Sequence, residues 1–512
     1  MNQLEKRISK EFRKFYDFAV SKRGTVPEIL GRLHALDEKF GKYRTYSFAI
    51  DGVLSNVAQE SRNLVLAKKA LSRLSSRKDT MPAAKFNYDM GNMLHLIGSL
   101  KMKTHHVRAF LETPEFFQSQ VAFSKVKPDP LGHFERANTN LANFLDNIGR
   151  NYEAIYFYDR ALLQDPLFGM AAGNKARAIL RYIDFTPQAS LPLLQTCSDL
   201  FQVAISDPEL STIGSEAVKE GFIAHKGKID TYLREVRYTP KKGKYSTKSH
   251  FLNFCLEKNL FLNFDFGYLY DKQSLEDSFF PKFIQSIDDK KSKFSTAMSE
   301  KIHFSFHVFN QILEDFAASR YMYFLSKSRP FKELDKRTKY TYTLDYTKNS
   351  IKYGLTKRSF AALYSILEKL ALITLNYTNT RHTFNTSENV YLNALLDPKF
   401  AKLAIEMNNY HLLAMYSLAK DFEEDHQYNK YRVIRNRIAH NFLSVDVGLL
   451  GEEEDFLILD TELEMAVEHM FHIVKSAVTY TILFLDGEAG KAGSKVGSME
   501  ALPQKNIFKH FP

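Results

Sequence analysis

The sequence has little cysteine, with only Cys197 and Cys255 among 512 residues. Two cysteines so far apart cannot form a disulfide framework or a Cys-x-x-Cys metal knuckle. Isolated thiols of this kind suit a reducing compartment. The cysteine content therefore predicts a cytoplasmic protein.

Long apolar segments are also missing. The first 16 residues are too charged to hold the apolar part of a secretory signal. The longest apolar stretch, Ala477–Leu485, is far shorter than the roughly 20 residues that a membrane span needs. We therefore expect neither export nor a membrane partner.

Several catalytic signatures are absent from the sequence: the phosphate-binding G-x-x-x-x-G-K-[ST] loop, the glycine fingerprint of dinucleotide sites, the H-E-x-x-H zinc motif and the G-x-S-x-G nucleophile elbow. His469 and His472 are three residues apart on an expected helix, but no third metal ligand accompanies them. We expect this pair to face solvent, and we predict no cofactor and no metal site.

What is present favours helices. Proline (15 residues) and glycine (22 residues) are few, and apolar residues mostly recur at spacings of three and four. The main exception is Thr341–Tyr346 (TYTLDY), a short hairpin arm or a loop. We predict an all-α chain of two or more domains, because 512 residues exceed one ordinary core. The formal charge of +11 fits an acidic partner such as RNA without identifying one.

The first half contains a repeat pattern. Thr139–Pro166 (TNLANFLDNIGRNYEAIYFYDRALLQDP) reads as two antiparallel helices, with Gly149 at the turn and Pro166 at the end. Small residues allow the two helices to approach closely: Ala142, Ala154 and Ala161. The segment resembles a tetratricopeptide repeat (TPR) along its full length, although an ordinary helical hairpin would share these features.

Two further segments match the repeat in part. Asn87–Gly98 resembles a first helix, with Gly91 in the small position and Gly98 at the turn, and Gly169–Ile183 resembles the first helix of a following unit. Stacked repeats bury one face and present another to a partner. We predict a TPR-like α-helical repeat domain over residues 1–235, with a protein or peptide partner.

The remaining chain divides into three parts. Residues 236–249 are predicted to form a basic linker, with an RNA-binding arm as the alternative. Residues 250–485 are expected to be a second helical domain, and residues 486–512 a flexible tail. The expected helices of the second domain are Ile302–Lys327, Ser359–Asn376, Tyr410–Phe422, Asn429–Leu443 and Thr461–Leu485, the last with Glu464 in a capping box.

One motif in this domain carries the chemistry. Arg435-Asn436-Arg437-Ile438-Ala439-His440 has the form R-N-x-x-x-H, on an expected helix that one more long helix follows. Histidine can accept or donate a proton near neutral pH, and arginine offers a permanent forked cation to phosphate oxygens. Asn436 and His440 are four residues apart and share a helix face. These are the groups that RNA cleavage without a metal requires.

The motif resembles the signature of the HEPN superfamily, many of whose members are RNases. Residues 250–480 also resemble a HEPN subgroup that follows TPR-like repeats in bacterial proteins, on segments that include HFLNFCLEKNLFLN from His250, YSILEKLA from Tyr364 and LLAMYSLAKDF from Leu412. Two positions depart from the pattern: Asp315 replaces a glutamate, and Ala439 replaces an acidic residue. The second departure bears directly on whether the site is active.

The resemblance implies a HEPN helical bundle that works as a homodimer, because one signature supplies one histidine and two facing protomers supply a pair. It makes Arg435, Asn436 and His440 the catalytic candidates. Arg432, Arg437 and Arg320 are candidate RNA contacts. Glu314 and Asp315 are candidate supports, unless they form an intrahelical ion pair with Arg320, and Lys369 is expected to pair with Glu368.

Two functions follow as expectations. The first is a metal-independent endoribonuclease that acts on RNA, with tRNA among the candidate substrates, in antiphage defence or stress, under the control of the repeats. The alternative is a non-catalytic TPR/HEPN adaptor that binds RNA, a nucleotide or a protein.

Overall fold

The computed structural model describes residues 3–21, 24–41, 43–102, 107–185, 191–239, 247–262, 277, 296–327, 335–341, 347–378, 390–407, 409–446 and 456–491. The prediction of an all-α chain is confirmed. The two strands that are described, β1 (Ser444–Asp446) and β2 (Leu457–Leu459), form a short parallel pair that the sequence did not suggest.

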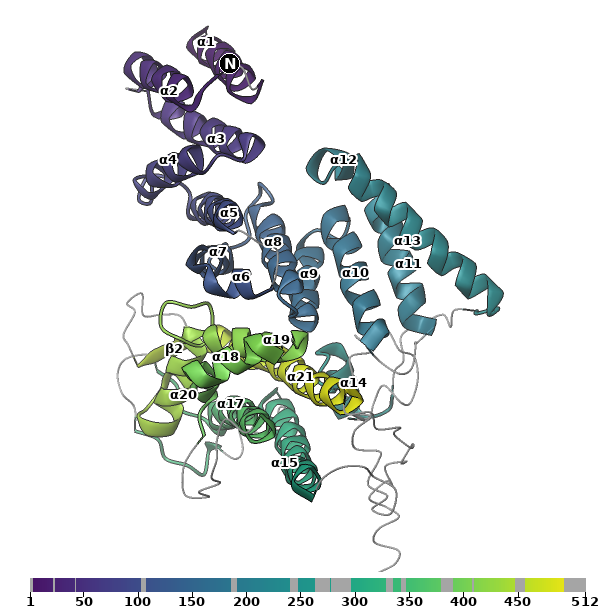
Figure 1. The fold of residues 1–512 in the computed structure, drawn as a ribbon. Helices are drawn as coiled ribbons and strands as arrows, with labels where there is room; N and C mark the ends of the chain where they lie inside the picture. Colours follow the sequence, from purple (N-terminus) through teal and green to yellow (C-terminus); the bar gives the residue numbers. More distant parts are fainter. Residues whose placement is uncertain are drawn as a thin grey trace, which may run out of the picture.

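The N-terminal half is a row of helices (Figure 1). In chain order they are α1 (Gln3–Val20), α2 (Val26–Phe40), α3 (Arg44–Ser61), α4 (Leu64–Ser75), α5 (Ala83–Lys101), α6 (Val107–Glu112), α7 (Pro114–Ser124), α8 (His133–Asn147), α9 (Asn151–Gln164), α10 (Gly169–Phe185), α11 (Leu191–Ser206), α12 (Leu210–Ile213) and α13 (Glu216–Glu235). Most helices that are next to each other in sequence pack against each other, as expected of stacked hairpins.

The predicted hairpin of residues 139–166 is present as α8 and α9. Gly149 lies between the two helices with φ +92°, a left-handed conformation that favours glycine. Ala142, Ala154 and Ala161 are fully buried. This region is helical and consistent with repeats, and its assignment to the TPR class stays a prediction.

The prediction for Gly91 and Gly98 was half right. A Cβ atom on Gly91 would lie 2.5 Å from the ring of Phe123, so this position must be small. Gly98, however, is a buried residue inside α5, which continues to Lys101. The helix that pairs with α5 is α7, and the short α6 lies between them in the chain.

The second half is a helical domain around one hydrophobic core. Its elements are α14 (His250–Glu257), α15 (Thr296–Lys327), α17 (Ile351–Tyr377), the 3-10 helix η3 (Leu392–Leu396), α18 (Pro398–Met407), α19 (Tyr410–Lys420), α20 (Asn429–His440), β1, β2 and α21 (Asp460–Lys491). Helix α17 packs against α15, α20 and α21, which places it at the centre of the domain.

Several helix boundaries differ from the expectations: α15 and α17 begin earlier, at Thr296 and Ile351, and α19 ends earlier, at Lys420. Helix α20 ends at His440 rather than Leu443, because residues 444–446 enter β1. Helix α21 begins at Asp460, and Glu464 pairs with Lys327 and Lys352 instead of closing a capping box. It also continues to Lys491, so part of the predicted tail is helical. The rest of the tail, residues 240–246 of the predicted linker and residues 342–346 lie outside the described residues.

One helix among the described residues, α17, is long and apolar enough to cross a membrane by length and composition. Its apolar side chains form part of the core of the domain, since Phe360, Leu363 and Leu367 are fully buried. In its most apolar window, 61% of the residues are buried. Burial in the protein core accounts for this composition.

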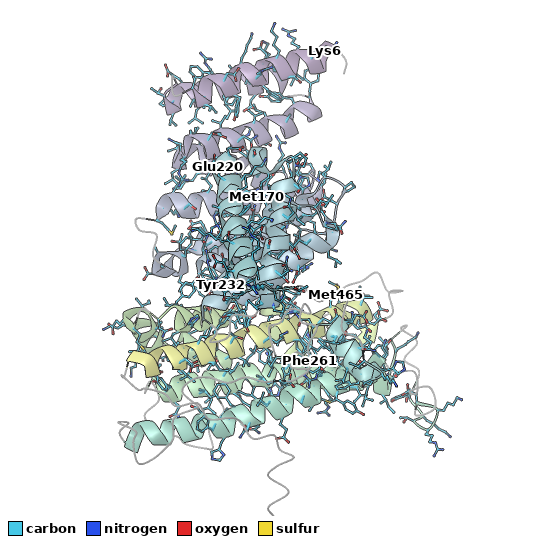
Figure 2. All side chains as sticks on the ribbon, turned by 90° about the vertical axis from the view of Figure 1, so that its right-hand side faces the viewer. Lys6, Met170, Glu220, Tyr232, Phe261 and Met465 are labelled. Atoms are coloured by element: carbon cyan, nitrogen blue, oxygen red, sulfur yellow. The ribbon has the colours of Figure 1, made fainter. Side chains whose placement is uncertain are left out.

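The two halves share a buried contact. Figure 2 shows Lys6 at the far end of the repeats and Phe261 in the C-terminal domain. At the junction, the fully buried Arg150 immediately precedes α9, donates to Glu153 at 2.6 and 2.9 Å, and forms an ion pair with Asp421 of the C-terminal domain. The Tyr428 hydroxyl donates to the same Glu153.

An aromatic contact extends this junction. The ring of Tyr156 on α9 stacks on His469 of α21 with ring centres 4.4 Å apart, and its distance to the ring of His472 is 4.6 Å. The expectation that these two histidines face solvent was therefore wrong. The sequence of α21 alone could not show that α9 covers them, and burial lowers the pKa of His469 well below its usual value and that of His472 to about 3.

The first prediction concerns Arg150. Arg150→Met leaves Glu153 and Asp421 buried without their counter-charge, so we expect a loss of about 3–5 kcal/mol in the free energy of unfolding. Urea unfolding of the full chain measures this loss of stability. The triple variant Arg150→Met, Glu153→Gln, Asp421→Asn removes all three charges and should recover part of the loss. A loss below about 1 kcal/mol for the single variant would contradict the buried pairing.

The second prediction concerns pH. His472 is neutral in the folded chain, whereas in the unfolded chain it binds a proton near pH 6.5, so stability falls as pH drops below that value. One such histidine contributes about 1.4 kcal/mol per pH unit. Urea unfolding between pH 7 and 5 measures how the free energy of unfolding changes with pH. This dependence should be weaker in His472→Gln than in wild type.

The exposed His34 provides the control. If His34→Gln changes the pH dependence as much as His472→Gln does, the prediction is wrong.

Candidate functional site

The motif residues lie on α20, whose two faces have different roles. Tyr431 and Ile434 are buried, and the ring of Tyr431 packs against Phe360 of α17. Asn436, Ala439 and His440 are exposed at the other face. Packing of the apolar face therefore holds the motif side chains at the surface of the domain.

The structure brings the three catalytic candidates together. The guanidinium of Arg435 lies with Nη1 3.2 Å from Nε2 of His440 and 3.2 Å from Oδ1 of Asn436. The side chain of Arg435 is mostly buried, at 17% exposure, while His440 is exposed. The cluster thus presents an imidazole to solvent beside a held cation.

The guanidinium of Arg435 also forms an ion pair with a glutamate that was not expected from the sequence to be its partner. Nη2 of Arg435 donates to Oε1 of Glu368 on α17 at 2.8 Å. Burial raises the pKa of Glu368, and the positive charges of Arg435 and Lys369 oppose that shift. The pair links α20 to α17, and it uses the guanidinium nitrogen other than the one that contacts His440.

Two tyrosines complete the surroundings of Arg435. Its guanidinium carbon lies 5.5 Å from the ring centre of Tyr364 and 5.8 Å from that of Tyr391. Burial raises the pKa of Tyr364 to about 12, with a further contribution from Glu368. Tyr391 is 47% exposed and forms part of the surface next to the motif.

The expected Lys369–Glu368 pair is not formed, because Glu368 pairs with Arg435. Lys369 instead donates to Asp315 of α15 at 2.7 Å. Asp315 therefore supports the cluster indirectly, through the residue next to Glu368. Glu314 is exposed on α15, and the structure shows no pairing of Asp315 with Arg320 among the described residues.

Arg320 does not belong to the exposed cluster. It is 7% exposed, its Nη1 pairs with Asp277 at 2.7 Å, and its guanidinium lies over Phe261. A buried and paired arginine is not available to an RNA phosphate, so the expectation that Arg320 contacts RNA was wrong. The sequence could not reveal this, because Asp277 is 43 residues away.

The other two candidate RNA contacts remain near the surface of α20. Arg432 is partly buried and donates to Asn429 at 2.9 and 3.2 Å, one turn earlier on the helix. Arg437 is partly buried beside Asn436. Beyond the helix, Phe442 is 65% exposed and packs against Phe456. Cationic and aromatic side chains thus lie around the Arg435–His440 pair.

No group of three or more histidine, cysteine, aspartate or glutamate side chains in the described parts of the chain could hold a metal ion. Cys197 and Cys255 are both buried, and burial raises the pKa of each thiol to about 12. The cluster itself consists of an imidazole, a guanidinium and an amide.

A helical bundle whose penultimate helix carries Arg435, Asn436 and His440 in contact has the features of a HEPN domain. Residues 296–488 match the model of one such family, the LA2681-like HEPN, so this part of the chain is a HEPN domain of that type. HEPN proteins are generally RNases, and the domains often dimerise and bind RNA. No curated protein and no solved structure matches the chain significantly.

The third prediction tests the Glu368–Arg435 pair. A double-mutant cycle of Glu368→Gln and Arg435→Met should give a coupling of about 1 kcal/mol in urea unfolding, because both side chains are largely shielded from water. The exposed pair Lys402–Glu406 serves as the control and should show a smaller coupling. Equal coupling for both pairs would argue against a held guanidinium.

Proposed function

We propose that the protein is a metal-independent endoribonuclease. The observation that carries the proposal is the contact between Arg435 and His440 at the surface of the HEPN domain. An exposed imidazole can exchange protons with a substrate, while the paired guanidinium beside it can stabilise the extra negative charge that develops on a phosphate.

The proposed reaction is an internal transesterification of RNA. The 2′-oxygen attacks the neighbouring phosphorus while the bond from phosphorus to the 5′-oxygen breaks. The products are a 2′,3′-cyclic phosphate and a 5′-hydroxyl. One base takes the proton of the 2′-hydroxyl, one acid gives a proton to the leaving 5′-oxygen, and Arg435 neutralises the phosphorane.

Two proton carriers are needed, and each signature contributes one histidine. We propose that two copies of the chain pair through the HEPN domain and bring two His440 and two Arg435 residues to one groove. The exposure of Asn436, Ala439, His440 and Phe442 in the single chain is consistent with a surface that a second copy covers. Arg432 and Arg437 would contact RNA phosphates at the edge of that groove.

The repeat half is proposed to regulate this site. Helix α9 reaches α20 through the contact of Glu153 with Tyr428, which immediately precedes α20. It also reaches Tyr431 through His469, which stacks on Tyr156 and hydrogen-bonds Tyr431 at 2.7 Å. A conformational change in the repeats would therefore be transmitted to α20, the helix that carries the motif. A cytoplasmic role in antiphage defence or stress, with tRNA as the first substrate to test, completes the proposal.

The fourth prediction is RNA cleavage. Purified tRNA and total RNA are incubated in EDTA with wild type, His440→Ala and Arg435→Ala. We expect discrete products with cyclic-phosphate ends from wild type and a loss of at least about 100-fold in each variant, the usual size of a general acid–base contribution. His34→Ala and Arg13→Ala, both on exposed positions of the repeats, should cleave like wild type.

The controls separate the alternatives. Circular dichroism and light scattering establish that each variant is folded and report its oligomeric state. Dimeric wild type that binds RNA without cleaving it would instead support the adaptor, which the departure at Ala439 favours. The variant Tyr156→Ala tests regulation, because it changes a side chain on the repeat side of the junction. An altered cleavage rate in a folded variant would support regulation by the repeats. An unchanged rate would count against it.

A further inference from the structure

An exposed tyrosine beside the candidate catalytic cluster has no role in the reaction proposed above. Tyr391 is 47% exposed, and the guanidinium carbon of Arg435 lies over its ring, 5.8 Å from the ring centre. Within the described ranges, no other aromatic ring packs against it, and its hydroxyl forms no hydrogen bond. A single exposed aromatic residue is ordinary on a protein surface. Its contact with the catalytic cation is what points to a role.

The chain anchors Tyr391 from both sides. Its backbone is extended, with φ −99° and ψ 157°, directly before the 3-10 helix η3. Side chains on an extended backbone point alternately to opposite sides. Val390 and Leu392 pack into the core of the domain, so the side chain between them points to solvent. The packing of its neighbours therefore presents this ring at the surface.

The second tyrosine beside Arg435 provides a contrast. Tyr364 is 6% exposed, and its ring meets that of Phe422 edge to face, with ring centres 5.6 Å apart. Tyr364 is thus part of the core and supports Arg435 from inside. Tyr391 lies beside the same guanidinium but keeps almost half of its surface open. Of the two rings, Tyr391 is the one that a substrate can reach.

The distances place this ring next to the scissile phosphate of the proposed reaction. Nη1 of Arg435 lies 3.2 Å from Nε2 of His440, so a phosphate that contacts both groups is held at the guanidinium. The same guanidinium lies over Tyr391. The sugars on the two sides of that phosphate each carry a base, and unstacked RNA bases commonly pack on aromatic side chains. A base next to the cut is therefore within reach of the ring.

We propose that Tyr391 holds a base next to the scissile phosphate by stacking on it. Arg435 and His440 act on the phosphate, which is the same at every position of an RNA, whereas Tyr391 contacts the base. Every base has a flat face that can stack on an aromatic ring. The proposal rests on the proposed endoribonuclease function and adds to it a base-binding residue from outside the motif.

A set of chimeric oligonucleotides tests the proposal. Each is a short DNA strand with a single ribonucleotide, so that only one phosphate can be cut, and two matched strands lack the base on the 5′ or the 3′ side of that phosphate. In EDTA, wild type should lose at least about fivefold in kcat/KM on one of the strands without a base. Tyr391→Ala should lose as much on the intact strand and nothing further on that strand.

Three variants separate the ring from other features of the side chain. Tyr391→Phe keeps the ring and should cleave like wild type, which would exclude a proton-transfer role for the hydroxyl. Tyr391→Leu keeps an apolar side chain without a flat face and should behave like Tyr391→Ala. Tyr232→Ala on α13 removes a tyrosine of similar exposure, 44%, and should cleave like wild type.

Binding is measured in parallel by fluorescence anisotropy on all-DNA strands, which cannot be cut. Weaker binding of the strand without the base, with the difference lost in Tyr391→Ala, would support stacking even without cleavage, and only the nuclease function would then fail. A folded Tyr391→Ala that keeps the wild-type response to the missing base would overturn the proposal. Loss of the dimer in light scattering, with that response unchanged, would assign Tyr391 to the pairing surface instead.

Discussion

The structure depends on a positive charge that is buried between its two halves. Arg150 is fully buried, and an unpaired charge in such a place would cost several kcal/mol. Burial alone would lower its pKa, but Asp421 and Glu153 raise it well above the usual value. Because Asp421 comes from the C-terminal domain and Glu153 from the repeats, the charge is satisfied only when the two halves are assembled.

This constraint changes how the N-terminal half should be viewed. Tyr428 donates to Glu153 and directly precedes α20, so the start of the motif helix is part of the same buried network. Removing residues 1–235 would uncover Tyr428, Tyr431 and His469 together with the missing charge partners. The proposed regulation by the repeats is therefore better tested with point variants at the junction than by deletion.

The sequence predicted what local pattern determines. Helices, the close packing at Ala142 and Gly91, the turn at Gly149 and the HEPN resemblance follow from spacing and small residues within one segment. It also placed Arg435 and His440 on one helix, where the long arginine side chain reaches round to the imidazole. These features need no knowledge of the rest of the chain.

What the sequence missed depends on contacts between distant segments. Glu368 is 67 residues from Arg435, and its neighbour Lys369 offered an equally plausible partner until α15 supplied Asp315. Arg320 is buried because Phe261 and Asp277 come to it from elsewhere in the chain. In each case the sequence offers several possible partners for a charged side chain. The packing of the helices determines which of these partners lies within reach.

The candidate catalytic cluster is exposed, whereas the junction between the two halves is buried. Glu368, Tyr364 and the buried face of α20 hold Arg435 from inside, yet His440, Asn436 and Ala439 face outward without a cover from the described part of the chain. A transesterification needs both an acid and a base around one phosphate, and a single exposed imidazole supplies one of them at a time. A second copy placed on this face would supply the other and exclude water. In the proposed mechanism, pairing of two copies, and not a rearrangement within one chain, therefore completes the site.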